Sequence, residues 1–203
     1  MNKLSFLIAL FVSANAFAVF EIGGNFAYDR NVYGDDRDNK KVTKTYSAFI
    51  AKYLFNLTAI EFNVSQSDTM ITESPGTQVS ETNYTITESV TNIRTKVWGV
   101  GLRQAMAPKK AFLIPTLSLG YARQIVESSG YFKLTNSTDG SVVRSDNTPY
   151  KDSYNSVYGT FSLKLRLTKY FSITASATTV FPAFEFDKAR DDVKYTGGFS
   201  WMF

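Results

Sequence analysis

Seven charged side chains are the residues best suited to do chemistry in this chain of 203 residues. Each one occupies a polar position in a segment where apolar and polar residues alternate. They are Glu21, Asp29, Glu61, Arg103, Lys164, Arg166 and Lys194. Carboxylates and cations that share a narrow interior form ion pairs, because an unpaired buried charge costs much more free energy. The alternative is a gated path for ions or small solutes along Lys164 and Arg166.

The chain contains no histidine and no cysteine. Histidine is a common general base because its pKa lies near the working pH. Zinc sites are usually built on histidine or cysteine. The sequence therefore predicts a protein that is not an enzyme and that has no cofactor and no bound metal. An enzyme that relies on serine, aspartate or tyrosine alone is the minor alternative.

The stretch 193–203 shows the alternation clearly. One side carries Val193, Tyr195, Gly197, Phe199, Trp201 and Phe203, and the other carries Lys194, Thr196, Gly198, Ser200 and Met202. Side chains of a β-strand point to opposite faces in turn, so this strand separates an apolar medium from a polar space. Both a soluble sandwich and a membrane barrel show such a pattern.

This stretch also resembles the C-terminal sorting strand of bacterial outer-membrane barrels, which their insertion machinery reads. The residues that carry the resemblance are Tyr195, Gly198, Phe199, Trp201 and Phe203. The N-terminus agrees with it: Lys3 precedes an apolar run over 4–12, and Ala16-Phe17-Ala18 forms a cleavage site. We therefore expect residues 1–18 to be a cleaved signal peptide and residues 19–203 to form an outer-membrane β-barrel.

Eight alternating segments account for the rest of the architecture. They cover about 20–28, 43–55, 60–65, 97–103, 113–124, 156–167, 171–181 and 193–203. Short turns near residues 55, 107 and 169 alternate with long connections near 36, 80, 139 and 187. This arrangement predicts an all-β, eight-stranded antiparallel up-and-down transmembrane β-barrel with short periplasmic turns and long extracellular loops. The pattern resembles the small barrels of the OmpA, OmpX and OmpW type.

The two longest connections, 66–92 and 127–155, are too long to be structureless, so we expect the flanking strands to continue beyond the membrane as protruding hairpins. The main alternative is a ten-stranded barrel in which parts of these connections span the membrane, and a soluble periplasmic sandwich is a second one. Five aromatic residues in the connections could contact a surface protein or glycan, or could pack on one another. They are Tyr84, Tyr131, Phe132, Tyr150 and Tyr154.

An eight-stranded barrel is just wide enough for its own side chains to fill it, so we expect the seven charged residues to plug the lumen. The predicted function is a non-enzymatic outer-membrane barrel for envelope integrity, adhesion or surface interaction. Outer-membrane lipid, lipopolysaccharide and the insertion machinery are the expected partners. Acidic and basic residues are interspersed at a net charge of +4, so no nucleic-acid partner is expected. The alternative, implied by resemblance to the OmpW type, is a narrow channel or lateral-exit path for small solutes, including hydrophobic ones.

Overall fold

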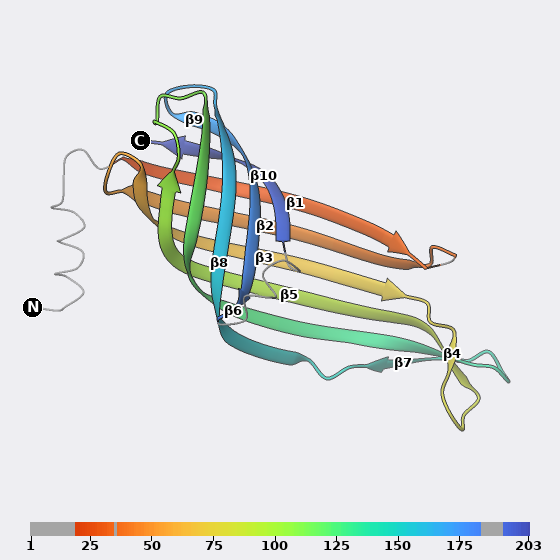
Figure 1. Ribbon diagram of the computed structural model, residues 1–203. Coiled ribbons are helices and arrows are strands. Elements are labelled where there is room, and N and C mark those ends of the chain that lie inside the picture. The colour runs from red at the N-terminus through yellow and green to blue at the C-terminus, as the bar shows by residue number, and fades with distance from the viewer. Residues whose placement is uncertain (1–18, 35, 184–192) are drawn as a thin grey trace, which may run out of the picture.

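The computed structural model describes residues 19–34, 36–183 and 193–203, so the predicted signal peptide lies outside the described residues. No helix in this described part is long and apolar enough to cross a membrane. The described chain is built from strands (Figure 1): β1 (Phe20–Tyr33), β2 (Asn39–Tyr53), β3 (Thr58–Glu73), β4 (Thr77–Gln78), β5 (Tyr84–Ala105), β6 (Leu113–Asn136), β7 (Val142–Asp146), β8 (Tyr150–Arg166), β9 (Phe171–Pro182) and β10 (Val193–Met202).

Eight of these strands close into an antiparallel ring. The order is β5-β3-β2-β1-β10-β9-β8-β6, and pairing of β5 with β6 closes it. Within the described residues β4 pairs only with β5 and β7 only with β6, so neither belongs to the ring. The predicted eight-stranded barrel is therefore confirmed, and the ten-stranded alternative is wrong.

The barrel's shear follows from its register. Hydrogen-bonded partners traced once round the ring lead from Leu113 of β6 through β8, β9, β10, β1, β2, β3 and β5 to Arg123 of the same strand. The rows thus climb ten residues per circuit. In an eight-stranded barrel this climb corresponds to strands tilted by roughly 40° from the barrel axis.

The alternation read from the sequence matches the two faces of the barrel. On β6, Leu113, Leu119 and Tyr121 are exposed on the outside, whereas Ile114 and Ser118 are buried inside. Large apolar side chains remain exposed over the outer face of the ring, while the buried positions face the lumen. An apolar outer surface of this extent requires an apolar medium or a partner to cover it.

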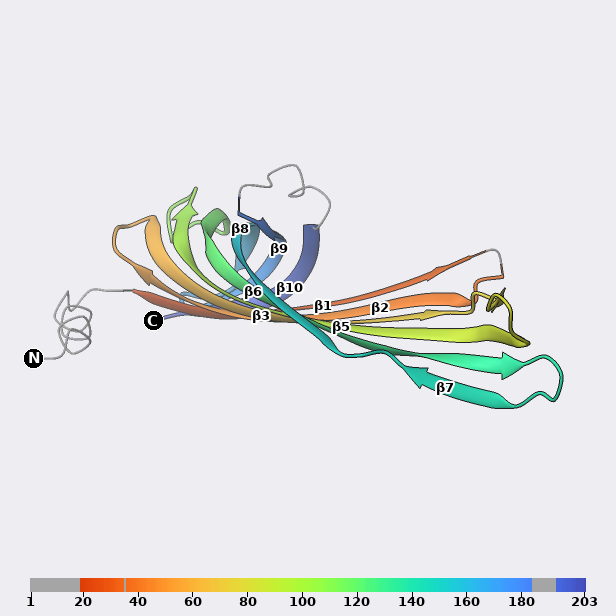
Figure 2. The ribbon, with the colours of Figure 1, turned by 90° about the horizontal axis from the view of Figure 1, so that it is seen from below.

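The paired strands β1, β2, β3, β5, β6 and β8 continue past the ring at the end opposite the short turns (Figures 1 and 2). The β3–β5 pairing runs to Glu73↔Ser89 and the β5–β6 pairing to Tyr84↔Asn136, whereas the β8–β9 pairing stops at Ser156↔Pro182. We call residues 31–34, 36–43, 68–95 and 126–151 the protruding sheet. The expectation that the long connections continue as paired strands is thus confirmed. The only register shift in the β5–β6 ladder lies between Ile86 and Glu88.

Two glycines make room for the largest side chain that is fully buried in the described lumen. Tyr158 of β8 lies across the backbones of β5 and β6, where Gly101 pairs with Gly120. A Cβ atom at Gly101 would lie 2.5 Å from the Tyr158 hydroxyl, and one at Gly120 would lie 2.5 Å from its ring. Glycine at these positions is therefore required by the packing of the tyrosine against the barrel wall.

This packing predicts different outcomes for two Gly→Ala substitutions. Gly120→Ala should destabilise the barrel by about 1–3 kcal/mol, because the methyl group overpacks the tyrosine and the facing backbone. Gly197→Ala on β10 should cost nothing, because no heavy atom lies within 4 Å of its Cβ position. Urea unfolding of protein refolded into detergent micelles measures both. Equal midpoints for the two variants would contradict the packing described.

Candidate functional site

A buried cluster of charges crosses the lumen in the half of the barrel near the short turns. Glu21 of β1 is fully buried and accepts a hydrogen bond of 2.6 Å from the Lys164 ammonium of β8. The Tyr53 hydroxyl of β2 donates to the same carboxylate at 2.8 Å. An Arg103 guanidinium nitrogen, Nη1, lies 3.4 Å from the other carboxylate oxygen, Oε1. Both cations are as deeply buried as the carboxylate.

Arg103 of β5 joins this carboxylate to a second one. Its Nε atom donates to Glu61 of β3, which also accepts a 3.0 Å hydrogen bond from the Ser118 hydroxyl of β6. The flat face of the guanidinium stacks on the ring of Phe49 at 3.9 Å. Two cations thus balance two carboxylates, and their side chains come from four different strands. We call Glu21, Glu61, Arg103 and Lys164 the lumen charge cluster.

The strand register explains why these groups meet. Glu21 and Glu61 occupy one hydrogen-bonded row with Ala51 of β2 between them. Two strand spacings separate the carboxylates' backbones by roughly 10 Å, which leaves space for one guanidinium to reach both. Ala51 is completely buried and its small side chain does not fill that space.

Three of the seven charged residues lie outside the cluster, and the expectation that all seven plug the lumen together is corrected accordingly. Asp29 is exposed, since it lies eight residues along β1 from Glu21, roughly 26 Å at strand spacing. Arg166 ends β8 and donates to the backbone carbonyls of Thr168 and Lys109 at the short turns, at 3.0 and 2.8 Å. Lys194 is half-buried at the opposite end of the lumen.

The sequence analysis did not identify the three neutral residues that contact the lumen charge cluster, which are Phe49, Tyr53 and Ser118. The available signal was β2, where both faces carry apolar side chains: Tyr46 and Ile50 lie outside as predicted, and the inner face carries the two aromatics. An inner strand face with bulky aromatics indicates a filled lumen rather than a wide channel.

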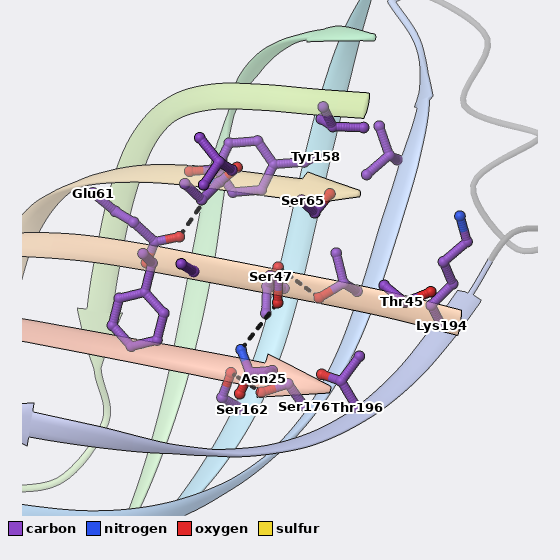
Figure 3. Close-up of a pocket in the computed structure, with 18 of the residues that line it drawn as sticks. Asn25, Thr45, Ser47, Glu61, Ser65, Tyr158, Ser162, Ser176, Lys194 and Thr196 are labelled. Carbon is purple, nitrogen blue, oxygen red and sulfur yellow. Dashed lines mark hydrogen bonds between the residues drawn. The ribbon is translucent and has the colours of Figure 1, made fainter. Parts of the chain in front are cut away.

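Above the cluster the lumen opens into a small polar cavity of about 80 Å³ (Figure 3). Glu61 and Tyr158 lie at its floor, Lys194 at its far end, and hydroxyl-bearing side chains line the walls. These include Thr45, Ser47, Ser65, Ser162, Ser176 and Thr196. A cavity of this volume holds only a few water molecules. In the described structure the lumen is therefore a small pocket that ends at the charge cluster.

Four of the five aromatic residues proposed as exposed interaction candidates are half-buried in the isolated chain: Tyr84, Tyr131, Phe132 and Tyr154. The Tyr131 hydroxyl donates to Glu88 at 3.0 Å, and the Arg144 guanidinium stacks on its ring at 3.9 Å. Hydrogen bonds from Lys133, at 2.8 Å, and from Tyr131 hold the pKa of Glu88 below its ordinary value. Tyr150 is the one of the five that is exposed, at 60%. Packing within the sheet therefore explains most of this set.

The residues predicted to form the insertion signal lie along β10 and at the C-terminal residue that follows it. Tyr195 is toward the protruding sheet, and Trp201 and Phe203 are at the short-turn end. Tyr195, Phe199, Trp201 and Phe203 point outward, and the Trp201 and Phe199 rings lie 5.9 and 6.3 Å from the ring of Phe171. Gly198 faces inward, where a Cβ atom would collide with Asn25 of β1. Their recognition by insertion machinery stays a prediction.

No protein-family model matches the sequence, and comparison with curated proteins gives no match. Among solved structures, the chain is similar to Ail, the attachment invasion locus protein of Yersinia pestis, in complex with the heparin analogue sucrose octasulfate. The two sequences are 13% identical, the match covers 92% of this chain and 99% of that one, and the TM-score is 0.49. It is also similar to the N-terminal β-barrel domain of Pseudomonas aeruginosa OprF, at 13% identity, 92% and 97% coverage and a TM-score of 0.49. Neisserial surface protein A matches at 9% identity, 91% and 93% coverage and a TM-score of 0.38. The likeness is one of fold.

The lumen charge cluster predicts a stability change that depends on which partner is removed. Lys164→Met should destabilise the barrel by about 3 kcal/mol, because the buried Glu21 carboxylate loses its nearest cation. The double variant Glu21→Gln/Lys164→Met should recover much of that loss, since no uncompensated charge remains. Urea midpoints in micelles check this, with the exposed Lys169→Met as control. If Lys164→Met unfolds at the same urea concentration as the control, the Glu21–Lys164 ion pair does not stabilise the barrel.

Proposed function

We propose that this protein is an exported, non-enzymatic outer-membrane barrel that uses its protruding sheet to contact partners outside the cell. The observation that carries the proposal is the combination of a plugged lumen with a paired, multi-stranded extension at one end only (Figure 2). A protein built to conduct solutes needs an open lumen, whereas a protein built to bind needs an ordered surface. Residues 1–18 would direct export and β10 would be read during insertion.

Support for the membrane location comes from the outer face. Its apolar side chains form a band that ends in aromatics on both sides, as membrane barrels require. Tyr170, Phe171, Trp201 and Phe203 cluster near the short turns. Tyr28, Tyr46, Trp98 and Tyr121 are exposed toward the protruding sheet. In this orientation the short turns are periplasmic and the sheet is extracellular.

The free edge of the protruding sheet supplies a contact surface. Among the described residues, β7 pairs with β6 on one side only, so its other side offers backbone donors and acceptors. Val142 and Val143 on β7 are 63% and 45% exposed, and Tyr150 on β8 is exposed further along the sheet. An extended segment of a partner protein could add to such an edge as a further strand. Adhesion or another surface contact is thus the role best supported, ahead of envelope integrity alone.

One observation favours the second candidate, a lateral-exit path. Pairing of β1 with β10 stops at Phe26↔Gly197, although β10 itself continues to Val193. Lys194 and Thr196, which line the lumen cavity, lie on β10 beyond the last β1–β10 pair and pair there with β9. The hydroxyl-rich walls suit small polar solutes better than hydrophobic ones.

The adhesion proposal is tested by removing the sheet's outer hairpin while leaving the barrel intact. Cells that display the protein should adhere to immobilised protein or glycan surfaces, and a variant with residues 131–146 replaced by Asn-Gly should lose that adhesion. Unheated gel mobility controls for folding of the trimmed barrel. Equal adhesion of the two cell types would contradict the proposal.

Conductance separates the two candidates. The plugged lumen predicts no steady channel when purified protein is added to a planar bilayer. A reproducible conductance that rises in Lys164→Met would instead favour the path through the lumen and past the end of the β1–β10 pairing.

A further inference from the structure

Four strands repeat one pattern on their outer face: an aromatic residue and, two positions nearer the protruding sheet, a cation. The pairs are Tyr28 and Arg30 on β1, Tyr46 and Lys44 on β2, Trp98 and Lys96 on β5, and Tyr121 and Arg123 on β6. Two positions along a strand keep the same face, so each cation stands directly above its aromatic. Arg30, Lys44 and Arg123 are exposed and Lys96 is half-buried. We call these four cations the basic collar.

The register puts the collar at one height. Tyr121 lies in the row of Ile22, and Trp98 lies in the row of Gly24. Each hydrogen-bonded row climbs ten residues toward the protruding sheet over the eight strands. Counted from β1, a row has therefore risen by about four residues when it reaches β5 and by about five when it reaches β6. This climb brings both aromatics to the height of Tyr28. The four aromatics thus form one ring segment, and the collar lies roughly 5 Å above it.

A groove lies on the outer face immediately above the collar. It has a volume of about 710 Å³, and Val42, Met70, Asn92 and Ser129 contribute to its lining. One hydrogen-bonded row crosses it with alternating charge: Lys44, Asp68, Arg94, Glu127 and Lys151. Arg94 pairs with Asp68 at 2.6 Å and Lys151 with Glu127 at 3.0 Å. Lys44 belongs to both the groove and the collar.

Two collar side chains are held in place by neighbours. The Arg123 guanidinium donates to the Ser153 hydroxyl at 2.8 Å and to the Asn155 amide oxygen at 3.3 Å. Lys96 lies 3.4 Å from Glu127 at the edge of the groove. A guanidinium fixed by neutral partners keeps its full charge and its remaining N–H donors for an anion.

We propose that the basic collar and the groove form a binding site for the headgroup of a phosphorylated glycolipid of the outer leaflet. The collar cations bind its phosphates, and the groove takes its sugar rings against polar and charged side chains. Aromatic residues mark the headgroup level of a membrane, and phosphates are the anions present just above it in such a leaflet. The groove also has the size of an ordinary ligand site. This inference rests on the proposed outer-membrane location.

The experiment uses the full mature barrel refolded in micelles and titrated with lipopolysaccharide that lacks its O-chain. The chain has two tryptophans, so Trp201→Phe leaves Trp98, beside the collar, as the single tryptophan, and excitation selective for tryptophan over tyrosine reports on it alone. In this background Lys44→Gln/Arg123→Gln should weaken binding about 25-fold, because each cation near an anionic surface contributes roughly a factor of five. The matched control Lys110→Gln/Lys169→Gln removes two exposed cations at the short turns and should change binding less than twofold.

Each other outcome overturns the inference in a distinct way. Equal weakening in both double variants would mean that general electrostatics, not the collar, binds the lipid. Equal affinity for dephosphorylated lipopolysaccharide would exclude the phosphates as the recognised groups. Displacement by millimolar inorganic phosphate would assign the collar to free phosphate instead of glycolipid. Failure of the refolded protein to show a heat-modifiable band would refute the membrane barrel itself, which distinguishes failure of the proposed function from failure of this site.

Discussion

The pairing of two buried carboxylates with two buried cations is the constraint on which the rest of the structure depends. Burial of Glu21 would be prohibitive without Lys164, Arg103 and the Tyr53 hydroxyl around it. Because these groups come from opposite parts of the ring, they can meet only if the barrel closes in the observed register. The same contacts fill the lumen where a conducting barrel would be open. Closure of the ring therefore also fills the lumen, and the function that we propose lies on the outer surfaces.

The outer surfaces fall into three zones along the barrel axis. The apolar band needs an apolar medium, the aromatics and the basic collar mark its upper limit, and the protruding sheet extends into water beyond it. The strands of the sheet continue the ladders of the barrel, and the β5–β6 ladder runs without a register shift from Ala105 as far as Glu88. A binding surface on such an extension costs less ordering entropy than a loop of equal length. We therefore propose this extension as the contact surface.

The fold could be predicted from the sequence because the alternation of apolar and polar residues shows which segments are strands. It also shows which side chains face outward and which face the lumen. The charge cluster was only partly accessible. Whether a residue stands at an odd or an even position of its strand shows that Glu21, Asp29 and Lys194 are on the inner face. Their positions along the barrel axis depend on the shear of the ring, and the local sequence pattern does not contain the shear. Phe49 and Tyr53 were missed because both faces of their strand are apolar. The pairs of aromatic and cation are visible in the sequence, yet they form a collar only when the tilt of the rows brings them level.

The most direct test of the central claim is cell fractionation combined with gel mobility in SDS before and after heating. A closed transmembrane barrel plugged by buried ion pairs should sediment with the outer membrane, require detergent for extraction, and run as a compact band until boiled. A soluble periplasmic protein whose mobility does not change on heating would contradict the account, because its apolar outer face would then have to be covered by something other than lipid.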